Sequence, residues 1–255
     1  MATWEIARNP GPVIATAVHA GHRMRPELLD RVALTDDERR REEDPLTDIL
    51  AGVGDQTFRA RTSRFEIDLN RPVNEAVYLD SSDAWGLTIW DEKPTDEMVA
   101  QSLETRAAFY DMMRGWIEES IAQHGRVLLL DVHSFNHRRD GPDADPAPAS
   151  DNPDIDLGLT TADEDRFGGV VDAFWSGLEG EAAGREIDIR RNVRFVDGGH
   201  WPEWVFAEYG ESVCTITLEY KKFFMDEWTN RADIAMLEDL RTNLSRATEA
   251  ARRAL

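Results

Sequence analysis

Residues 127–134 read Val-Leu-Leu-Leu-Asp-Val-His-Ser, an apolar run that ends in polar residues. An uninterrupted run of this kind is typical of a strand that is buried on both faces of a sheet. Residues 98–124, which precede it, carry apolar side chains at helical spacing, and Gly125 is placed to end that helix. We therefore expect a long helix that is followed at once by a central strand.

The alternation of strands and helices continues along the chain. We expect further strands at 13–18, 65–69, 187–195 and 213–218, and further helices at 163–184 and 232–255. The charged residues 34–48 fit either a helix or an exposed connection, the proline-rich residues 134–161 predict a long loop, and 197–199 predict a turn. The pattern predicts an α/β fold, with helices on both faces of a mixed central sheet, in one domain over residues 1–255.

The charge and hydropathy of the chain exclude several partners. Its 255 residues include 29 Lys and Arg against 50 Asp and Glu, a net charge of −21. Nucleic acids and anionic membranes require a basic face, so we expect neither as a partner. The longest aliphatic run, 127–130, is far shorter than the roughly 20 residues of a spanning helix. With no export signal and with Cys214 as its single cysteine, we expect a cytoplasmic protein.

Three histidines lie just after predicted strands. His19 and His22 follow the strand at 13–18, and His133 follows the strand at 127–132. A close pair of ligands with a distant third is the usual spacing of a catalytic zinc site, where water takes the fourth position. Asp131 is placed to hold the imidazole of a neighbouring ligand. By spacing alone, a metal site and a set of ordinary polar loop histidines fit equally well.

Arginines crowd into a short segment of this acidic chain, at positions 59, 61, 64 and 71. Arginine suits bidentate binding of a carboxylate, and Asn70 beside Arg71 would complete a clamp for one. The alternative is surface charge that is balanced by neighbouring acidic residues. Such a clamp predicts a small acidic molecule as the ligand.

A carboxylate ends the predicted strand at 213–218. Glu219 lies where a general base beside an activated water would be placed, although pairing with Lys221 or Lys222 explains it as well. Cys214 lies within that strand and is expected to be a buried thiol rather than a nucleophile. The chain has neither a glycine-rich phosphate loop after a strand nor a Gly-x-Ser-x-Gly motif, which disfavours nucleotide binding and serine hydrolysis.

Several of these segments together form a family pattern. They are His19-Ala-Gly, Ser63-Arg64, Asp68-Leu-Asn-Arg-Pro72, Asp131-Val-His-Ser134, Asn152-Pro-Asp-Ile-Asp-Leu-Gly158 and Leu218-Glu219. With them the chain resembles the N-formylglutamate amidohydrolase family, which shares the phosphorylase/hydrolase-like fold of zinc carboxypeptidases. The resemblance spans about residues 13–228, and Asp-Leu-Asn-Arg-Pro is its most specific part.

The resemblance implies a zinc-dependent hydrolase that cleaves the linear amide of a small N-formyl or N-acyl amino acid. One Zn²⁺ would be held by His19, His22 and His133, with Asp44 as the alternative to His22. Glu219 would activate the water. The substrate-binding residues would be Arg64, Asn70, Arg71 and His200, and Arg64 would also polarise the carbonyl group.

Two other functions stay open on the sequence. One is a carboxypeptidase or deacylase that acts on a larger N-acyl or peptide substrate. The other is a non-catalytic protein that binds an acidic metabolite with its arginines. The first would take a larger substrate and the second a small acidic molecule, and the sequence does not indicate an oligomeric state.

Overall fold

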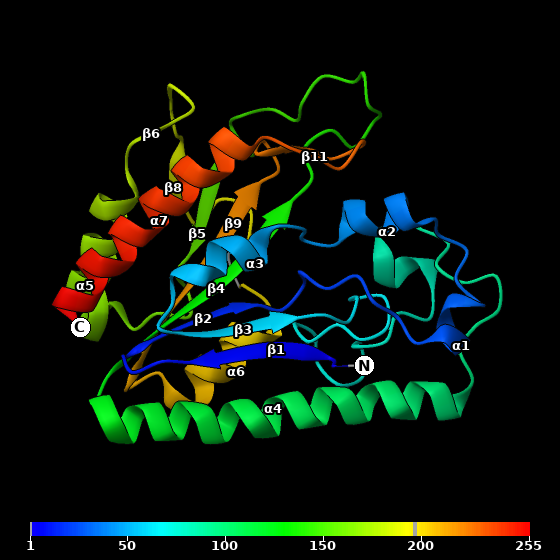
Figure 1. The fold of residues 1–255 in the computed structure, drawn as a ribbon, viewed down its shortest axis with the longest axis horizontal. Coiled ribbons are helices and arrows are strands. Elements are labelled where there is room, and N and C mark those ends of the chain that lie inside the picture. Colours follow the sequence, from blue (N-terminus) through cyan, green and yellow to red (C-terminus); the bar gives the residue numbers. More distant parts are fainter. Residues whose placement is uncertain (1, 196–197) are drawn as a thin grey trace.

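The computed structural model describes residues 2–195 and 198–255. Within these residues, the chain forms a seven-stranded sheet of order β1-β3-β2-β4-β9-β5-β8 (Figure 1). Its strands are β1 (Trp4–Arg8), β2 (Val13–Ala17), β3 (Gln56–Ala60), β4 (Val127–Phe135), β5 (Ile155–Gly158), β8 (Ile189–Arg191) and β9 (Val213–Lys221). Strands β3, β2, β4 and β9 run parallel, whereas β1 and β5 are antiparallel to β3 and β9. The predicted α/β fold with a mixed sheet is confirmed.

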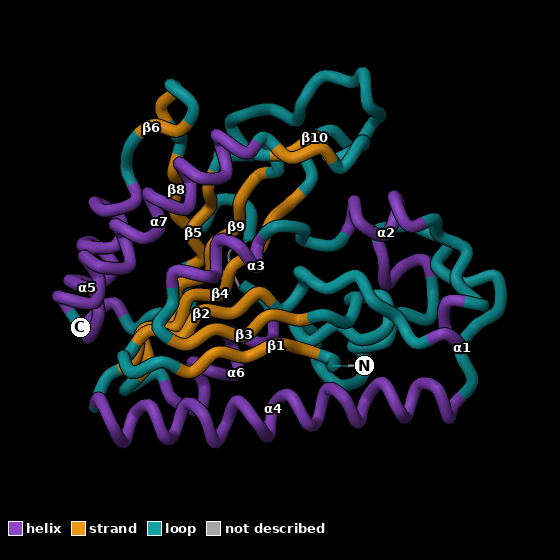
Figure 2. The backbone as a smooth tube through the Cα atoms, viewed as in Figure 1, coloured by secondary structure: helices purple, strands orange, loops and turns teal. Residues whose placement is uncertain are grey.

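Helices cover both faces of this sheet. They are α1 (Pro26–Leu29), α2 (Asp36–Glu42), α3 (Thr47–Leu50), α4 (Asp96–His124), α5 (Glu164–Leu178), α6 (His200–Tyr209) and α7 (Ile234–Ala254). The remaining described elements are two short 3-10 turns, η1 (Ala51–Val53) and η2 (Ser81–Ala84), and two hairpins. The hairpins are formed by β6 (Glu181–Ala182) with β7 (Arg185–Glu186) and by β10 (Met225–Asp226) with β11 (Arg231–Ala232). Figure 2 shows α4 and α6 on one side of the sheet and α5 and α7 on the other. No helix in the described chain is long and apolar enough to cross a membrane.

Strand β4 forms the middle of the hydrophobic core, as its sequence predicts. Every residue of β4 is buried. Leu128 and Leu130 pack in the core that includes α5 and α7, whereas Leu129 packs in the core that includes α4 and α6. Side chains that alternate between two covered faces explain why the sequence of β4 is apolar without interruption.

The helix that precedes β4 begins and ends as its sequence predicts. The Thr95 side chain accepts a hydrogen bond from the Met98 N–H, which caps the first turn of α4. At the other end Gly125 adopts a φ of 78°, a conformation that glycine reaches without strain. The residue types at the two ends therefore fix the length of this helix.

The prediction of a strand at 65–69 is wrong. Phe65, Ile67 and Leu69 alternate with polar residues, but these residues form turns and loop. Glu66 and Asp68 are as buried as the apolar residues between them. They stay buried because they have partners: Glu66 accepts a hydrogen bond from the Arg25 N–H, and Asp68 receives several. The alternation therefore reflects buried polar contacts rather than a solvent-exposed face.

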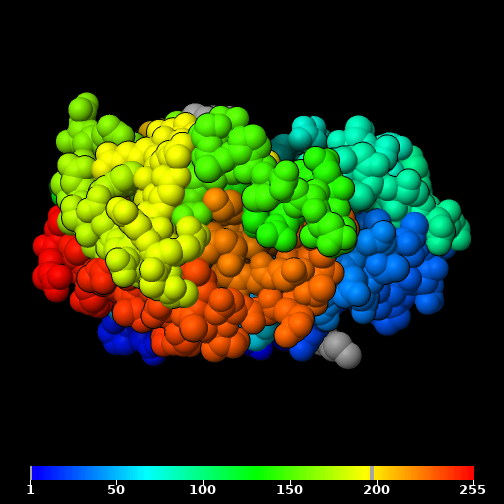
Figure 3. Space-filling model, turned by 90° about the horizontal axis from the view of Figure 1, so that it is seen from above, coloured from blue at the N-terminus to red at the C-terminus, as the bar shows by residue number. Residues whose placement is uncertain are grey.

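Three other boundaries differ from the predictions. The expected strand at 187–195 shortens to β8, and the expected helix at 163–184 ends at Leu178, before the β6–β7 hairpin. The expected loop at 134–161 contains the end of β4 and all of β5. Strand β5 was missed because its sequence, Ile-Asp-Leu-Gly, includes an aspartate that is nonetheless buried. The turn expected at 197–199 starts outside the described residues. In Figure 3, the green surface of the loop after β4 borders the orange surface that includes β10 and β11.

Candidate metal centre and active site

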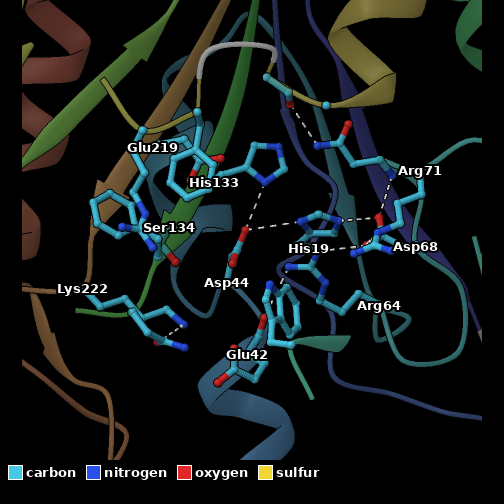
Figure 4. Close-up of a pocket in the computed structure, with 18 of the residues that line it drawn as sticks. His19, Glu42, Asp44, Arg64, Asp68, Arg71, His133, Ser134, Glu219 and Lys222 are labelled. Atoms are coloured by element: carbon cyan, nitrogen blue, oxygen red, sulfur yellow. Dashed lines mark hydrogen bonds and ion pairs between the residues drawn. The ribbon is translucent and has the colours of Figure 1, made fainter. Parts of the chain in front are cut away.

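Two histidines and an aspartate meet at the carboxyl edge of the parallel strands. His19 follows β2, His133 lies near the end of β4, and Asp44 lies between α2 and α3. The Nδ1 atoms of His133 and His19 lie 3.1 and 3.5 Å from Asp44 Oδ2. All three side chains are buried, and Figure 4 shows Asp44 pointing toward both rings. This set is the candidate metal centre.

Each imidazole also contacts a second carboxylate, through its Nε2 atom. The Nε2 atom of His19 lies 2.7 Å from Asp68, and that of His133 lies 2.8 Å from Asp131. Each ring therefore has one carboxylate at Nε2 and turns its Nδ1 atom toward Asp44. Metal-binding histidines usually have such carboxylate partners, which orient the ring and make it more basic. The contact expected between Asp131 and a neighbouring imidazole is therefore present.

The distances from Asp44 to the two histidine nitrogens fit a divalent ion, and all three ligand atoms lie within 4.8 Å of one another. A tetrahedral zinc ion with ligand distances of about 2.0–2.1 Å has its ligand atoms about 3.3–3.4 Å apart. The observed distances of 3.1 and 3.5 Å lie on either side of this value. Two imidazoles and one carboxylate are a common ligand set of catalytic zinc, with water in the fourth position. The residues present therefore fit such an ion.

The electrostatics of the cluster also favour a cation. Burial raises the pKa of Asp44, but its contacts with His133 and His19 outweigh this and hold the pKa well below the ordinary value. Burial lowers the pKa of His133, but Asp131 and Asp44 together raise it well above the ordinary value. The two rings thus lie beside the carboxylates of Asp44 and Asp68, whose pKa values are both held low, so positive charge in this space is stabilised.

The structure does not bring His22 into this cluster. Its Nδ1 atom lies 2.7 Å from Glu43, and its Nε2 atom lies 3.7 Å from Asp36. Residues three apart share a face only in a helix, and residues 18–22 are not helical. His22 therefore turns away from His19, and the geometry favours Asp44, the alternative, as the third residue.

Glu219 lies beside the cluster on β9. In the parallel pairing of β4 with β9, Glu219 is the partner of His133, and both residues line the same cavity. The side chain is only 7% exposed, and burial raises its pKa to about 8. The alternative pairing with lysine is absent, because Lys221 binds Asp154 and Lys222 binds other oxygens. Glu219 is therefore placed to exchange a proton with a molecule in the cavity.

The cavity has a volume of about 640 Å³ and collects residues from distant parts of the chain. Besides the candidate ligands and Glu219, it is lined by four arginines, at positions 64, 71, 139 and 194. Aromatic side chains close parts of its wall, among them Trp85, Phe135 and Phe195. A cavity with this lining suits a small molecule that carries negative charge.

The comparison with protein families agrees with this site. The family model described as N-formylglutamate amidohydrolase matches residues 11–224. The chain belongs to the N-formylglutamate amidohydrolase family. Members of this family are hydrolases, and the matched region contains every residue of the candidate metal centre as well as Glu219.

Two solved structures, of an N-formylglutamate amidohydrolase and of a gene product of Agrobacterium tumefaciens, show the same fold. The N-formylglutamate amidohydrolase of Ralstonia eutropha JMP134 matches with a TM-score of 0.77 and 19% identity, over 100% of this chain and 98% of its own. A gene product of Agrobacterium tumefaciens matches with a TM-score of 0.68 and 16% identity, over 97% of this chain and 95% of its own. A metallo-carboxypeptidase of Burkholderia cenocepacia has a TM-score of 0.34 and 14% identity, over 96% of this chain and 56% of its own. No curated protein matches significantly.

In this member of the N-formylglutamate amidohydrolase family, the expected arginine clamp is partly occupied by the protein itself. Arg64 donates to Asp68, to the Tyr78 hydroxyl and to the backbone oxygen of Glu42. Arg71 lies at the cavity wall, 4.7 Å from the centre of the Tyr78 ring and 3.9 Å from Asp68. Arg64 therefore supports the carboxylate that holds His19, whereas Arg71 is more available to a ligand.

Two further expected substrate contacts have structural partners. The Asn70 side chain donates to the Gly198 oxygen and accepts from the Trp201 N–H, so it ties its segment to the start of α6. His200 lies at the start of α6, with its ring 5.8 Å from that of Tyr110, and is not among the described residues that line the cavity. Their roles in substrate binding stay predictions.

The sequence reasoning missed two arginines of the cavity, Arg139 and Arg194. Arg194 donates to Asn152, and its guanidinium lies 5.1 Å from the Phe135 ring centre. The buried Asp156 accepts hydrogen bonds from the backbone N–H groups of residues 193–195, which fixes this loop. Asn152 and Asp156 both belong to the segment Asn152–Gly158 that carries part of the family resemblance. That segment was the signal that could have led to Arg194.

Proposed function

We propose that this chain is a zinc-dependent hydrolase that cleaves the linear amide of a small N-formyl or N-acyl amino acid. The observation that carries the proposal is the buried His19-Asp44-His133 cluster beside Glu219, in a cavity with arginines in its wall. The family match and the similarity to the N-formylglutamate amidohydrolase of Ralstonia eutropha JMP134 support the choice of substrate. We also propose a small acidic partner, no nucleic acid or membrane partner, and a cytoplasmic location.

The residues of the cavity have different roles in the proposed reaction. His19, Asp44 and His133 would hold a zinc ion, which supplies polarisation of the carbonyl group and acidification of a water molecule when bound. Glu219 takes a proton from the attacking water and delivers it to the amine nitrogen as the carbon–nitrogen bond breaks. The products are the free amino acid and formate, or the corresponding acyl carboxylate.

The substrate carboxylate would be held by arginine. Arg71 is the first candidate, since Arg64 already has protein partners for its three nitrogens. Arg139 and Arg194 provide positive charge on the same cavity. A fixed carboxylate orients the amide for attack, which removes part of the entropic cost of the reaction.

A deacylase or carboxypeptidase for a larger substrate is the second candidate. The observation in its favour is the cavity volume of about 640 Å³, which leaves room beside a small formylated amino acid. The two enzymes would share the same cluster and base, so geometry alone does not separate them.

Metal analysis and a substrate panel test the proposal. We expect the purified protein to bind zinc and the zinc-loaded protein to release formate from N-formyl amino acids, with acidic ones turned over fastest. Faster cleavage of N-acetyl amino acids or dipeptides would favour the second candidate. A protein that binds no zinc and turns over none of these compounds would contradict both and leave a binding protein for an acidic metabolite.

A further inference from the structure

A buried lysine lies beside the candidate metal centre without contacting its ligand atoms. Lys222 follows β9, is 1% exposed and lines the cavity. Its Nζ atom donates to the backbone oxygens of Arg41 and Glu43, at 2.6 and 2.7 Å, and to Asn136 Oδ1 at 3.0 Å. An ammonium has three N–H donors, so these three acceptors satisfy it completely.

These three bonds join the chain segments that form the candidate metal centre. Residues 41 and 43 directly precede Asp44, Asn136 follows the strand that carries His133, and Lys222 itself follows the strand that carries Glu219. The label in Figure 4 places Lys222 on the side of Asp44 away from Asp68. One ammonium therefore connects the aspartate segment to both central strands.

Asp44 depends on such connections because its own segment is irregular. Helix α2 ends at Glu42 and α3 begins at Thr47, so Asp44 lies in a turn between two short helices. Its N–H donates to the His19 oxygen at 3.0 Å, and its oxygen accepts from the Thr47 hydroxyl at 2.6 Å. These contacts fix Asp44 itself, whereas Lys222 fixes the residues that lead into it.

We propose that Lys222 is a positioning residue that sets Asp44 at ligand distance from His19 and His133. The inference rests on the proposed metal-dependent function. Burial lowers the pKa of Lys222 to about 8, so the side chain carries its three donors at neutral pH. Its charge also offsets part of the negative charge of the nearby carboxylates, of which Asp44 acts most strongly, followed by Glu42 and Glu227.

The neighbouring lysine provides a matched control. Lys221 also lies at the end of β9, but its Nζ atom binds Asp154 at 2.7 Å and the Asn152 oxygen at 3.0 Å, and it does not line the cavity. Replacement of either lysine by methionine removes one buried or half-buried charge from the same strand end. Only the replacement at 222 removes a contact with the segment that carries Asp44.

The test is the zinc affinity of the metal-free protein, measured by competition with a chromophoric chelator. We expect Lys222→Met to lower the affinity about 10- to 100-fold, the usual effect of removing a partner that orients a ligand. Lys221→Met should stay within about threefold of the wild type. The visible spectrum of the cobalt-loaded protein should change in Lys222→Met and not in Lys221→Met, since a role confined to stability would leave the coordination unchanged.

The outcomes separate the two proposals. A wild type that binds no zinc contradicts the proposed function and this inference with it. A wild type that binds zinc, with an unchanged affinity in Lys222→Met, contradicts the role of Lys222 alone. If Lys222→Met does not fold, the zinc affinity of Asn136→Ala tests the inference instead, because this variant removes one acceptor of the same ammonium. A severalfold loss of zinc affinity in that variant supports the inference, and an unchanged affinity overturns it.

Discussion

Arg64 and Arg194 line the same cavity in different surroundings. Arg64 uses its three nitrogens on Asp68, Tyr78 and a backbone oxygen. Arg194 makes a hydrogen bond to Asn152, and within the part of the chain that the structure describes no carboxylate lies at ion-pair distance from it. An arginine with saturated donors holds the site together, whereas one with unused donors is available to an anionic ligand.

The same contrast separates two regions of the cavity. We call the inner site the set His19, Asp44, Asp68, His133 and Glu219 together with Arg64, all of which are largely buried. We call the rim the set Arg71, Arg139 and Arg194. Changes in the inner site should affect metal binding and turnover, and changes at the rim should affect substrate binding.

The largest effect is expected at Glu219. Replacing Glu219 by Gln keeps the shape of the side chain but removes the group that accepts the proton, so kcat should fall about 10²- to 10⁴-fold. Zinc content should be unchanged. Turnover by the zinc-loaded variant is measured beside Glu211→Gln, a control with a highly exposed side chain. Near-normal turnover in Glu219→Gln would refute its role as the base.

Arg64→Met tests whether the inner arginine builds the site. Asp68 would keep its contacts with His19 and Arg71 but lose Arg64 while it stays fully buried, and loss of one member of a buried ion pair costs up to about 3–5 kcal/mol. Urea unfolding of the metal-free protein measures this loss, and zinc affinity should fall about 10-fold or more. Arg61→Met is the control, because Arg61 pairs with the partly exposed Glu5. A changed KM with normal stability and zinc affinity would instead make Arg64 a substrate ligand.

At the rim, Arg194→Met should weaken substrate binding without altering the chemistry. Loss of a charged hydrogen bond costs about 1.5–3 kcal/mol, which corresponds to a KM about 10- to 100-fold higher at an unchanged kcat. Steady-state kinetics with an acidic N-formyl amino acid measure the KM and kcat of the variant. Arg191→Met serves as the control, since Arg191 pairs at the surface with Asp172. A large loss of kcat at normal KM would remove the distinction between rim and inner site.

The smallest effect is expected from Asp156→Asn. This change keeps the shape of the side chain but weakens its bonds to the backbone N–H groups of residues 193–195, so Arg194 should be less well placed. We expect KM to rise severalfold, less than in Arg194→Met, and the double variant to show little further increase. Fully additive effects would mean that Asp156 acts on substrate binding by a route other than Arg194.

The sequence predicts the parts of this molecule whose burial comes from apolar residues. The strand at 127–134 is clear because both of its faces are covered. Residues 65–69 and 34–48 are misread or left undecided because several of their buried members are charged and are stabilised by partners elsewhere in the chain. Arg39, Glu43 and Asp44 are each about 2% exposed, which no hydropathy pattern of this charged segment indicates.

The residues of the site divide in the same way into those that the sequence predicts and those that it does not. His19, His133 and Glu219 were found because each lies at the end of a strand that the sequence shows. Asp44 entered only through the family resemblance, and Arg194 was missed because its place depends on the fold of the Asn152–Gly158 segment. Contacts between segments that are apart in the sequence, such as Arg64 with the Glu42 oxygen or Arg194 with Asn152, decide which arginine is free.

The pairing of β4 with β9 runs without a break from Val127 opposite Val213 to Phe135 opposite Lys221. His133 and Glu219 lie within this ladder, whereas Arg139 and Arg194 lie on connecting segments outside it. Insertions and exchanges in those segments can therefore accumulate during evolution without moving Glu219 relative to His133. New specificities can arise in this scaffold while the reaction itself is inherited unchanged.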